Sequence, residues 1–393
     1  MASTYQTLDR LDVKGKRVLV RADLNVTLAG GKIADDTRIR EAVPTVTALI
    51  GKGARQVILM SHLGDPKGAV VRELSLAPVA KRLAKLLGLP VPLVTDYLAG
   101  IKGAEGAKVI LLENLRFHPG EEANDAEFAK RLAALADIYV NDAFGTAHRA
   151  HASIVGVPEH LPAAAGLLMQ KELSMLAEAR DSPKKPLVVV LGGAKLKTKL
   201  PVIERYLRKA DHIIISGAMA YTFFAARGLA TGASLVEKDF LEKAKSLLAD
   251  REFRERAVFP VDVVVARERS ASSERKTVPV EEIPAGWMAL DIGPRSVERF
   301  SKLFASAGMV IWNGPLGYYE IPSFAEGTRA VASALASSKG KVIAGGGDTI
   351  TVIESLGVGK RYAHLSTGGG AFLDYLAGKE LPALAALERA RKA

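Results

Sequence analysis

The chain has 393 residues, of which 48% are hydrophobic and 25% charged, and it contains 36 glycines and no cysteine. This length exceeds that of one typical domain and predicts two, and the composition indicates a folded α/β protein rather than a disordered chain or a fibre. The absence of cysteine excludes a disulfide framework, a cysteine metal site and a thiol nucleophile.

The net charge of +11 favours anionic partners. Aromatic residues make up only 6% of the chain and no basic run exceeds two residues, as in Lys184–Lys185, so we expect small anions rather than nucleic acid. The N-terminal sequence MASTYQTLDRLDVKGK lacks the apolar core of a secretory signal, and the longest uncharged apolar stretch, 213–226, is too short to span a bilayer. We therefore expect a cytoplasmic protein with no membrane partner.

The first half of the chain repeats one unit, in which an aliphatic run is followed by polar residues and then by an amphipathic helix. The aliphatic runs are RVLV at 17–20, QVILM at 56–60, KVILL at 108–112 and IYV at 138–140. Such alternation predicts a doubly wound parallel sheet covered by helices. Ligands of these sheets bind at the carboxyl ends of the strands, so the residues that follow the runs are expected to lie together.

Arginine and histidine recur among the residues that follow these runs. The set comprises Arg21, Asp23 and Asn25 after the first run; Ser61, His62 and Gly64 after the second; Glu113, Asn114 and Arg116 after the third; and Asn141, Asp142, His148, Arg149 and His151 after the fourth. Arg38 follows a predicted helix N-cap and adds another cation. Alone, His62 could be a structural histidine and Arg116 a surface charge. Their recurrence at four strand ends predicts a socket for a small multivalent anion.

The centre of the chain contains a predicted helix. The leucines at 167, 168, 173 and 176 follow a helical period, with Pro162 before them and Pro183 and Pro186 after them. A long helix bracketed by prolines near the midpoint indicates a connector between two domains, although it could equally be one more packing helix.

The second half repeats strand and helix with glycine in place of arginine at the turns. The predicted strands are LVVVL at 187–191, HIIIS at 212–216, VVVA at 263–266, MVIW at 309–312 and KVIA at 341–344, and a turn STGGG at 366–370 opens the last helix. Glycines at helix starts expose backbone amides that bind phosphate, so this half is expected to bind a nucleotide. Neither GxxxxGK[ST] nor GxGxxG occurs, which argues against a P-loop NTPase and a standard dinucleotide-binding dehydrogenase.

Two lysines follow the first of these strands. LVVVL runs into Gly192 and Gly193 and then into a helix that opens with Lys195 and Lys199, four residues apart and therefore on one face. Two cations at the positive end of a helix are unfavourable unless a polyanion binds there. This pattern favours a phosphate site, and a solvated helix start is the alternative.

Asp348 follows three glycines at another predicted helix start. It could be an N-cap alone, but a carboxylate beside a phosphate site also suits Mg²⁺, which is the interpretation we favour. Asn313 and Glu320, in NGPLGYYE, could contact the sugar or the base edge of a nucleotide, while Asn313 could instead serve a turn with Pro315.

Nine motifs, taken in order, resemble those of the phosphoglycerate kinase family: RADLNV, DDTRI, SHLGDPKG, LLENLRF, NDAFGTAHRAHAS, LGGAKLKTK, WNGPLG, GGGDT and STGGGA. The resemblance covers essentially the whole chain. It implies reversible transfer of the acyl phosphate of 1,3-bisphosphoglycerate to ADP, giving 3-phosphoglycerate and ATP in glycolysis and gluconeogenesis, with Mg²⁺, by a monomer whose domains close. It also implies two Rossmann-like domains: 1–166 with a returning tail at 372–393 for the acidic substrate, an interdomain helix and linker at 167–185, and 186–371 for the nucleotide.

The functional residues of the family carry over by motif to positions of this sequence. The acidic substrate would be bound by Arg21, Asp23, Asn25, Arg38, His62, Arg116 and Arg149, and the nucleotide by Gly192, Gly193, Lys195, Lys199, Gly217, Gly293, Asn313, Glu320, Gly346, Gly347, Asp348 and Thr349. Asp348 would also hold the metal. The resemblance implies that Arg38 and Lys195, with Gly347 and Gly370, act on the phosphoryl group during transfer.

Three positions depart from the family pattern. Asp65 stands where arginine is usual and reverses a charge beside the predicted anion socket, Thr27 replaces a proline, and residues 216–218 replace a more glycine-rich triplet. We expect Asp65 to weaken binding of the acid unless Lys67 or Arg72 compensates. Two alternatives are a non-catalytic protein of the same fold that binds anions or nucleic acid, and a nicotinamide-dependent dehydrogenase, which the missing glycine fingerprint disfavours.

Overall fold

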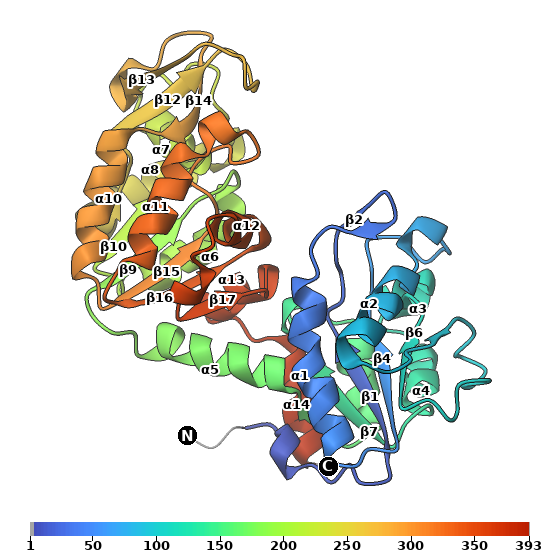
Figure 1. The fold of residues 1–393 in the computed structure, drawn as a ribbon. Coiled ribbons are helices and arrows are strands. Elements are labelled where there is room, and N and C mark those ends of the chain that lie inside the picture. Colours follow the sequence, from blue (N-terminus) through green and yellow to red (C-terminus); the bar gives the residue numbers. More distant parts are fainter. Residues whose placement is uncertain (1–3, 393) are drawn as a thin grey trace. The chain divides into compact units, whose positions relative to one another are not determined.

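The computed structural model describes residues 4–392 and consists of two compact units (Figure 1). Unit 1 comprises Met1–Ser174 and Glu380–Ala393, and unit 2 comprises Met175–Lys379. The division falls inside helix α5 (Leu167–Asp181), which occupies the centre of the chain.

The last two helices belong to different units. Helix α13 (Gly370–Leu376) packs on α6 of unit 2, whereas α14 (Pro382–Lys392) packs on strand β8 and on the 152–159 turns of unit 1. The backbone amide of Ala383 donates to the carbonyl of Ala147 at 3.1 Å. The tail that was expected at 372–393 therefore divides at Glu380, because its first helix finds its apolar partner in unit 2.

Unit 1 is built on a six-stranded sheet in which every pairing is parallel. Its order is β5-β6-β4-β1-β7-β8, with the strands β1 (Arg17–Ala22), β4 (Gln56–Met60), β5 (Leu93–Val94), β6 (Val109–Leu112), β7 (Ile138–Asp142) and β8 (Ala163–Ala165). All residues of β4, β6 and β7 are buried, as expected of strands that are covered on both faces. The predicted parallel sheet is confirmed.

Helices and short turns connect the strands of unit 1. They are η1 (Leu8–Arg10), α1 (Thr37–Gly51), η2 (Arg72–Leu74), α2 (Ala77–Leu87), η3 (Leu115–Phe117), α3 (Pro119–Glu122), α4 (Ala126–Ala133), η4 (Phe144–Thr146), η5 (Ala152–Gly156) and η6 (Val157–Glu159), with a small hairpin of β2 (Leu28–Ala29) and β3 (Lys32–Ile33). The main apolar core lies between the sheet and helices α1 and α2, where Val18 and Val57 pack near Ile39 and Leu83. This packing holds the carboxyl ends of the strands in register.

Unit 2 contains a second parallel sheet of six strands, in the order β11-β10-β9-β15-β16-β17. The strands are β9 (Leu187–Leu191), β10 (His212–Ile215), β11 (Ala257–Val258), β15 (Met309–Asn313), β16 (Lys341–Gly345) and β17 (His364–Ser366). Asn313 pairs with both Leu191 and Gly345, so three strands end level with one another. The glycine turns that follow them therefore meet at one edge of the sheet.

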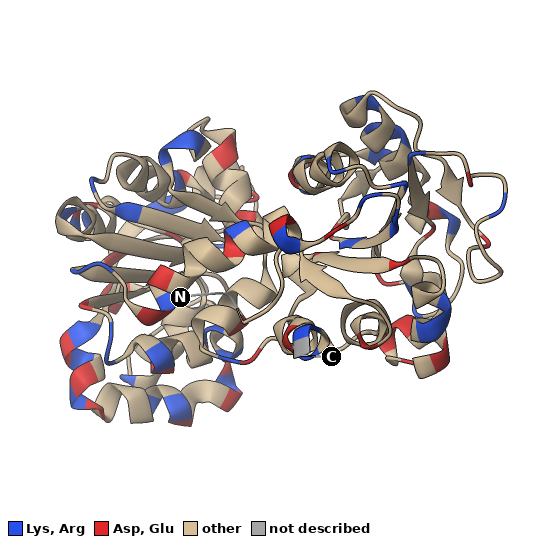
Figure 2. Cartoon of the chain, turned by 90° about the horizontal axis from the view of Figure 1, so that it is seen from below, with Lys and Arg blue, Asp and Glu red and all other residues tan. Residues whose placement is uncertain are grey.

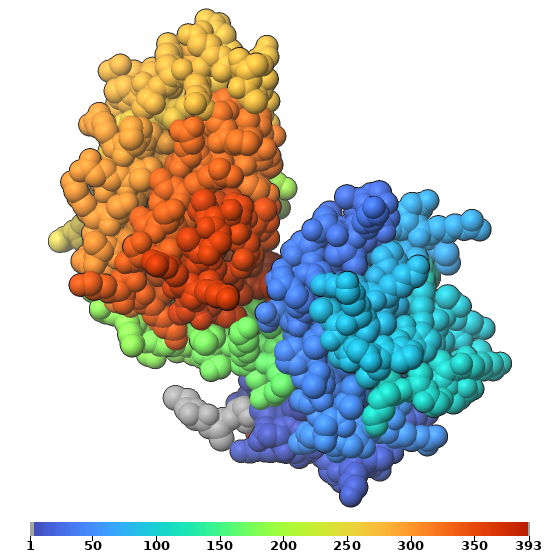
Figure 3. All heavy atoms as spheres, in the orientation of Figure 1, coloured from blue at the N-terminus to red at the C-terminus, as the bar shows by residue number. Residues whose placement is uncertain are grey.

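The predicted pairing of one strand, VVVA at 263–266, was wrong. VVVA forms the greater part of β12 (Asp262–Ala266), but β12 is the centre of a separate antiparallel sheet with β13 (Arg275–Pro279) and β14 (Met288–Ile292). The short connection between β12 and β13 allows a hairpin and is too short for the crossover that parallel neighbours require. This sheet lies at the end of unit 2 opposite to α5 (Figure 1, Figure 3).

The remaining elements of unit 2 are helices and short turns. They are α6 (Leu196–Tyr206), α7 (Met219–Ala226), η7 (Lys238–Phe240), α8 (Leu241–Ala249), α9 (Arg251–Arg256), η8 (Val280–Glu282), α10 (Pro294–Ser306), η9 (Pro322–Phe324), α11 (Glu326–Ala336), α12 (Gly347–Ser355) and η10 (Gly359–Arg361), in addition to α13. Within residues 4–392 none of the helices has the length and apolar character needed to cross a bilayer. Lysine and arginine are spread over both units with acidic residues between them (Figure 2).

Candidate active site

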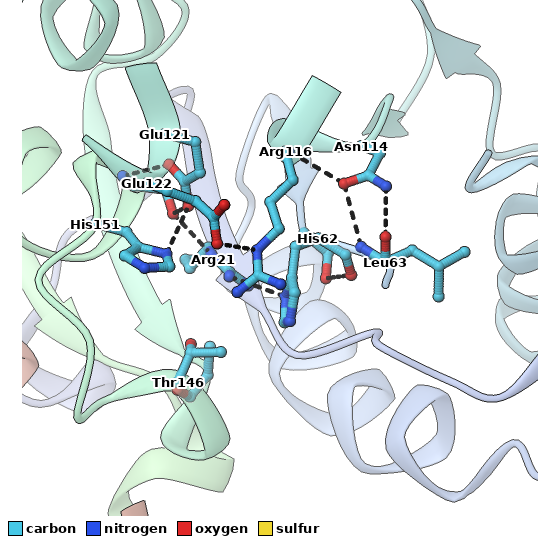
Figure 4. Close-up of polar contacts among 12 residues, drawn as sticks. Arg21, His62, Leu63, Asn114, Arg116, Glu121, Glu122, Thr146 and His151 are labelled. Atoms are coloured by element: carbon cyan, nitrogen blue, oxygen red, sulfur yellow. Dashed lines mark hydrogen bonds and ion pairs between the residues drawn. The ribbon is translucent and has the colours of Figure 1, made fainter. Parts of the chain in front are cut away.

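The anion socket of unit 1 is built around Arg21, near the carboxyl end of β1. The side chain is only 1% exposed, and Nε donates to Oγ of Ser153 at 2.8 Å. Nη2 lies 3.2 Å from Nδ1 of His62, which follows the neighbouring strand β4 (Figure 4). Strand pairing brings these residues together, because Arg21 lies level with Met60.

His62 is a neutral acceptor toward Arg21. Burial and the charges of Arg21, Arg116, Arg149 and Arg38 hold the pKa of His62 well below its usual range. A guanidinium can only donate, so Nδ1 of His62 accepts and Nε2 carries the proton. The neutral ring therefore lies among cations, and its Nε2–H can serve as a further donor to an anion.

A buried carboxylate organises the other side of Arg21. Glu121 is fully buried and accepts two hydrogen bonds from Ser153, from Oγ at 2.6 Å and from the backbone amide at 2.9 Å. His151 lies 3.9 Å from the same carboxylate, while burial and the neighbouring arginines lower the pKa of His151 to about 4. Neither Glu121 nor Ser153 stands out in the sequence as a site residue, because neither follows a strand directly.

Arg116 supplies a buried donor that no residue of the described part of the chain accepts. The side chain is 5% exposed, Nη1 donates to the carbonyl of Gly64 at 2.7 Å, and Nε lies 3.1 Å from Oε1 of Glu122. Nη2 is buried and has no hydrogen-bond partner among residues 4–392. An unpaired buried donor costs about 1–3 kcal/mol, which a bound anion would relieve. Asn114 fixes the backbone here by accepting from the amide of Arg116 at 3.1 Å.

The rim of the socket carries two more cations. Arg38, in the first turn of α1, is 30% exposed and forms an ion pair with Asp23. Asn25 accepts from the amide of Gly64 at 2.9 Å and so joins the first two strand ends. Arg149 is partly exposed, and its charge lowers the pKa of His62, Arg116 and His151, which places it beside them. All seven residues of the predicted acid site therefore lie in unit 1.

Not every residue at these strand ends belongs to the socket. Oδ1 of Asp142 accepts from the backbone amides of Leu168 and Met169 at 2.8 and 3.2 Å, so this carboxylate caps helix α5. Burial raises the pKa of Asp142 to about 7. Burial lowers the pKa of Arg116, and the charge of the exposed Asp65 nearby acts in the opposite direction. The negative charge of Asp65 therefore faces the socket.

The second site lies at the glycine turns of unit 2. The amide of Gly192 donates to the carbonyl of Asn313 at 2.9 Å, and that of Gly193 donates to the carbonyl of Pro315 at 2.8 Å. A Cβ on Gly192 would lie 2.2 Å from the oxygen of Pro315, and one on Gly217 would lie 2.5 Å from the nitrogen of Gly193. Only glycine allows this close approach of three turns.

Two adjoining pockets open at these turns. A cavity of about 230 Å³ has apolar walls that include Tyr221, Leu235, Met288 and Leu290, and Glu320 lies at its rim. A cavity of about 310 Å³ is lined by Lys195, Lys199, Asn313, Gly346, Gly347, Thr349 and Gly369, among others. Gly193, Ala194, Pro315 and Asp348 line both. The first cavity suits a flat apolar base, and the second, rich in glycine and lysine, suits phosphate.

The two lysines of the second cavity differ in environment. Lys195 is exposed at the N-cap of α6, so that the helix begins one residue after it. Lys199 is 8% exposed and donates to Oδ1 of Asn313. Burial lowers the pKa of Lys199 to about 8, although the charge of Asp348 acts in the opposite direction. Asn313 also donates to the carbonyl of Gly345 at 2.7 Å, so it links two strands as well as lining the cavity.

Two short helices begin beside the phosphate cavity. Helix α12 begins at Gly347 after Gly346, whose φ of +101° favours glycine, and α13 begins at Gly370 after Gly369. Thr349 is buried and accepts from the amide of Gly314 at 2.8 Å. Gly370 itself is not among the residues that line the two cavities.

Gly293 also lies outside the residues that line these cavities. It is the N-cap of α10, and a Cβ there would lie 2.3 Å from the carboxylate of Asp262. The structure thus explains this glycine by packing.

Asp348 provides the one carboxylate that lines both cavities. It lies in the first turn of α12, and Oδ1 accepts from Oη of Tyr319 at 2.8 Å. Within residues 4–392 no group of three or more histidine, cysteine, aspartate or glutamate residues could enclose a metal ion. A single carboxylate beside a phosphate cavity fits Mg²⁺, which usually takes one or two protein oxygens and completes its shell with phosphate and water.

Known proteins share the sequence pattern and the fold of this chain. The model of the family "Phosphoglycerate kinase" matches residues 8–379. The phosphoglycerate kinase of Synechococcus elongatus is 52% identical over 98% of this chain and 99% of the relative, and that of Pelotomaculum thermopropionicum is 50% identical over 97% and 98%.

Solved structures show the same likeness. Phosphoglycerate kinase from Coxiella burnetii has a TM-score of 0.87 at 41% identity, and that from Pyrococcus horikoshii OT3 has 0.88 at 33%; each comparison covers 98% of this chain and 99% of the other. The chain therefore belongs to the phosphoglycerate kinase family.

Proposed function

We propose that each of the two sites binds one of the two substrates of a single phosphoryl transfer. As a member of its family, the chain catalyses the reversible reaction of 1,3-bisphosphoglycerate and ADP that gives 3-phosphoglycerate and ATP in glycolysis. The socket of unit 1 binds the acid and the paired cavities of unit 2 bind the nucleotide. The observation that carries this assignment is the cluster of buried arginines in unit 1, with Nη2 of Arg116 left without a partner in the described residues.

In the proposed acid complex, Arg21, Arg116 and Arg149 bind the phosphate and carboxylate of 3-phosphoglycerate. Planar guanidinium groups match these oxygens in pairs. His62 adds the donor Nε2–H. Glu121 and Ser153 hold Arg21 in place through the hydrogen bonds described above, so the socket is arranged before the acid enters.

In the proposed nucleotide complex, the base occupies the apolar cavity and the phosphates occupy the cavity of Lys195 and Lys199. Asp348 would hold Mg²⁺. When bound, the ion supplies positive charge that neutralises phosphate oxygens. Helices α12 and α13 begin at Gly347 and Gly370, next to residues that line the phosphate cavity, and their positive ends would favour phosphate there.

The transfer step depends mainly on position and charge. Phosphoryl transfer needs in-line alignment and cations around the moving group, and little covalent chemistry from the protein. Arg38, which is partly exposed at the rim of the acid site, and Lys195, which is exposed at the nucleotide site, are assigned to the transferring phosphoryl group. Because the acid and the nucleotide bind to different units, we propose that the units close for reaction, which also excludes water from the acyl phosphate. We further propose a cytoplasmic monomer that acts on small molecules, without nucleic-acid or membrane partners.

The test is ATP-dependent phosphorylation of 3-phosphoglycerate, measured with and without Mg²⁺. Arg38→Ala should lower kcat by about a hundredfold or more, as expected when a cation that stabilises the transition state is lost. Arg40→Ala is the matched control, because Arg40 lies on the same helix and is exposed and paired with Asp36. Wild-type protein that binds nucleotide but transfers no phosphate would refute the proposal.

A further inference from the structure

We infer that Tyr319 is a positioning residue for Asp348, and that it orients this carboxylate toward the metal ion. The inference rests on the proposed function, in which Asp348 holds Mg²⁺. Tyr319 lies in the loop that follows β15, and its Oη is 2.8 Å from Oδ1 of Asp348. A phenol is protonated near neutral pH, so Tyr319 donates and Asp348 accepts.

The ring of Tyr319 is held more firmly than the carboxylate it contacts. Tyr319 is half-buried and packs against the apolar core that contains residues of β15 and β16, and its backbone amide donates to the carbonyl of Gly317 at 3.0 Å. Asp348 is exposed and, apart from Tyr319, no hydrogen bond or ion pair is shown for its side chain within residues 4–392. An exposed aspartate loses rotamer freedom when it binds an ion, and a fixed donor removes part of that cost in advance.

The location of the pair explains what it would do. Asp348 lines both the apolar cavity and the phosphate cavity, whereas Tyr319 lines only the apolar one. The hydrogen bond occupies Oδ1 and leaves Oδ2 for a cation that arrives with the phosphates. Partners of metal-binding carboxylates commonly fix the orientation of the ligand in this way, and their loss costs about 10–100-fold in metal affinity.

The chain offers a matched control beside Tyr319. Tyr318 also lines the apolar cavity, and its ring lies under the guanidinium of Arg269. Tyr319→Phe and Tyr318→Phe each remove one hydroxyl and keep the ring, but only the first removes the hydrogen bond to Asp348.

The measurement is the dissociation constant of ADP, determined by titration calorimetry with excess Mg²⁺ and again with EDTA. For wild type, Mg²⁺ should strengthen binding. Tyr319→Phe should reduce that strengthening by about tenfold, the lower end of the range because the pair is partly exposed, and should change the EDTA value by less than about twofold. Tyr318→Phe should retain the full effect of the metal.

Asp348→Asn separates the possible failures. Suppose that Asp348→Asn abolishes the effect of Mg²⁺ on ADP binding. If Tyr319→Phe then keeps that effect, or weakens ADP binding equally with and without Mg²⁺, the inference is overturned and the proposed metal site stands. If wild type shows no metal effect, the proposed metal site fails and the inference fails with it. In the Asp348→Asn background, Tyr319→Phe should have no further effect on the metal dependence; an additive loss would also overturn the inference.

Discussion

Lys199 should make nucleotide binding depend on pH in a direction that its burial determines. Desolvation lowers its pKa from the ordinary 10.5 to about 8, which corresponds to about 3 kcal/mol against the charged form. Phosphate oxygens would favour the charged form, so ADP should bind the protonated lysine. Its apparent affinity should therefore be nearly full at pH 7 and fall as the pH rises through 8.

The size of the effect follows from the fraction of Lys199 that is protonated. With a pKa of about 8, roughly nine-tenths is charged at pH 7 and roughly one-tenth at pH 9, so the dissociation constant of ADP should rise by about tenfold between these values. The same lowered pKa means that the ligand-free protein should become more stable as pH rises from about 8 toward 10.5, since the unfolded lysine retains its proton longer.

The assay is calorimetric titration with ADP at pH 7, 8 and 9 in two buffers of different ionisation enthalpy. It measures the affinity for ADP and the number of protons that the complex takes up on binding. Lys199→Arg is the control, because arginine stays charged over this range and should give a flat profile. A flat profile for wild type, or no proton uptake near pH 8, would refute the assignment of Lys199 to the phosphate site.

Two further predictions concern Asp65 and the glycine turns. Asp65→Arg should lower KM for 3-phosphoglycerate by up to about fivefold, the scale of an exposed charge, and leave KM for ATP nearly unchanged. Glu105→Arg, at another exposed acidic position of unit 1, is its control, and an unchanged or raised KM for the acid would contradict the prediction. Gly192→Ala should reduce the free energy of unfolding by about 1–3 kcal/mol in denaturant titration, because its Cβ would lie 2.2 Å from the oxygen of Pro315. Gly106→Ala, whose Cβ meets nothing within 4 Å, should be nearly neutral; equal stability of the two variants would count against the close packing of the turns.

Much of the fold could be predicted from local pattern. Runs such as QVILM and LVVVL are too uniformly apolar for anything but strands buried on both faces, and both are central strands of parallel sheets. The polar residues that follow them were expected at one edge, and Arg21 and His62 indeed meet there at 3.2 Å. The location of these polar residues can be predicted from the sequence because the carboxyl ends of parallel strands lie at one edge of the sheet.

Other features depend on partners far away in sequence, which no local pattern specifies. VVVA has the same composition as the parallel strands, yet the short connection to β13 leads it into an antiparallel sheet. Ser153 joins Arg21, 132 residues away, to Glu121. The sequence indicates that Lys199 lies at a phosphate site, but not that its pKa is lowered. Its lowered pKa arises only because folding buries it against Asn313, 114 residues further along the chain, where water no longer stabilises the charge.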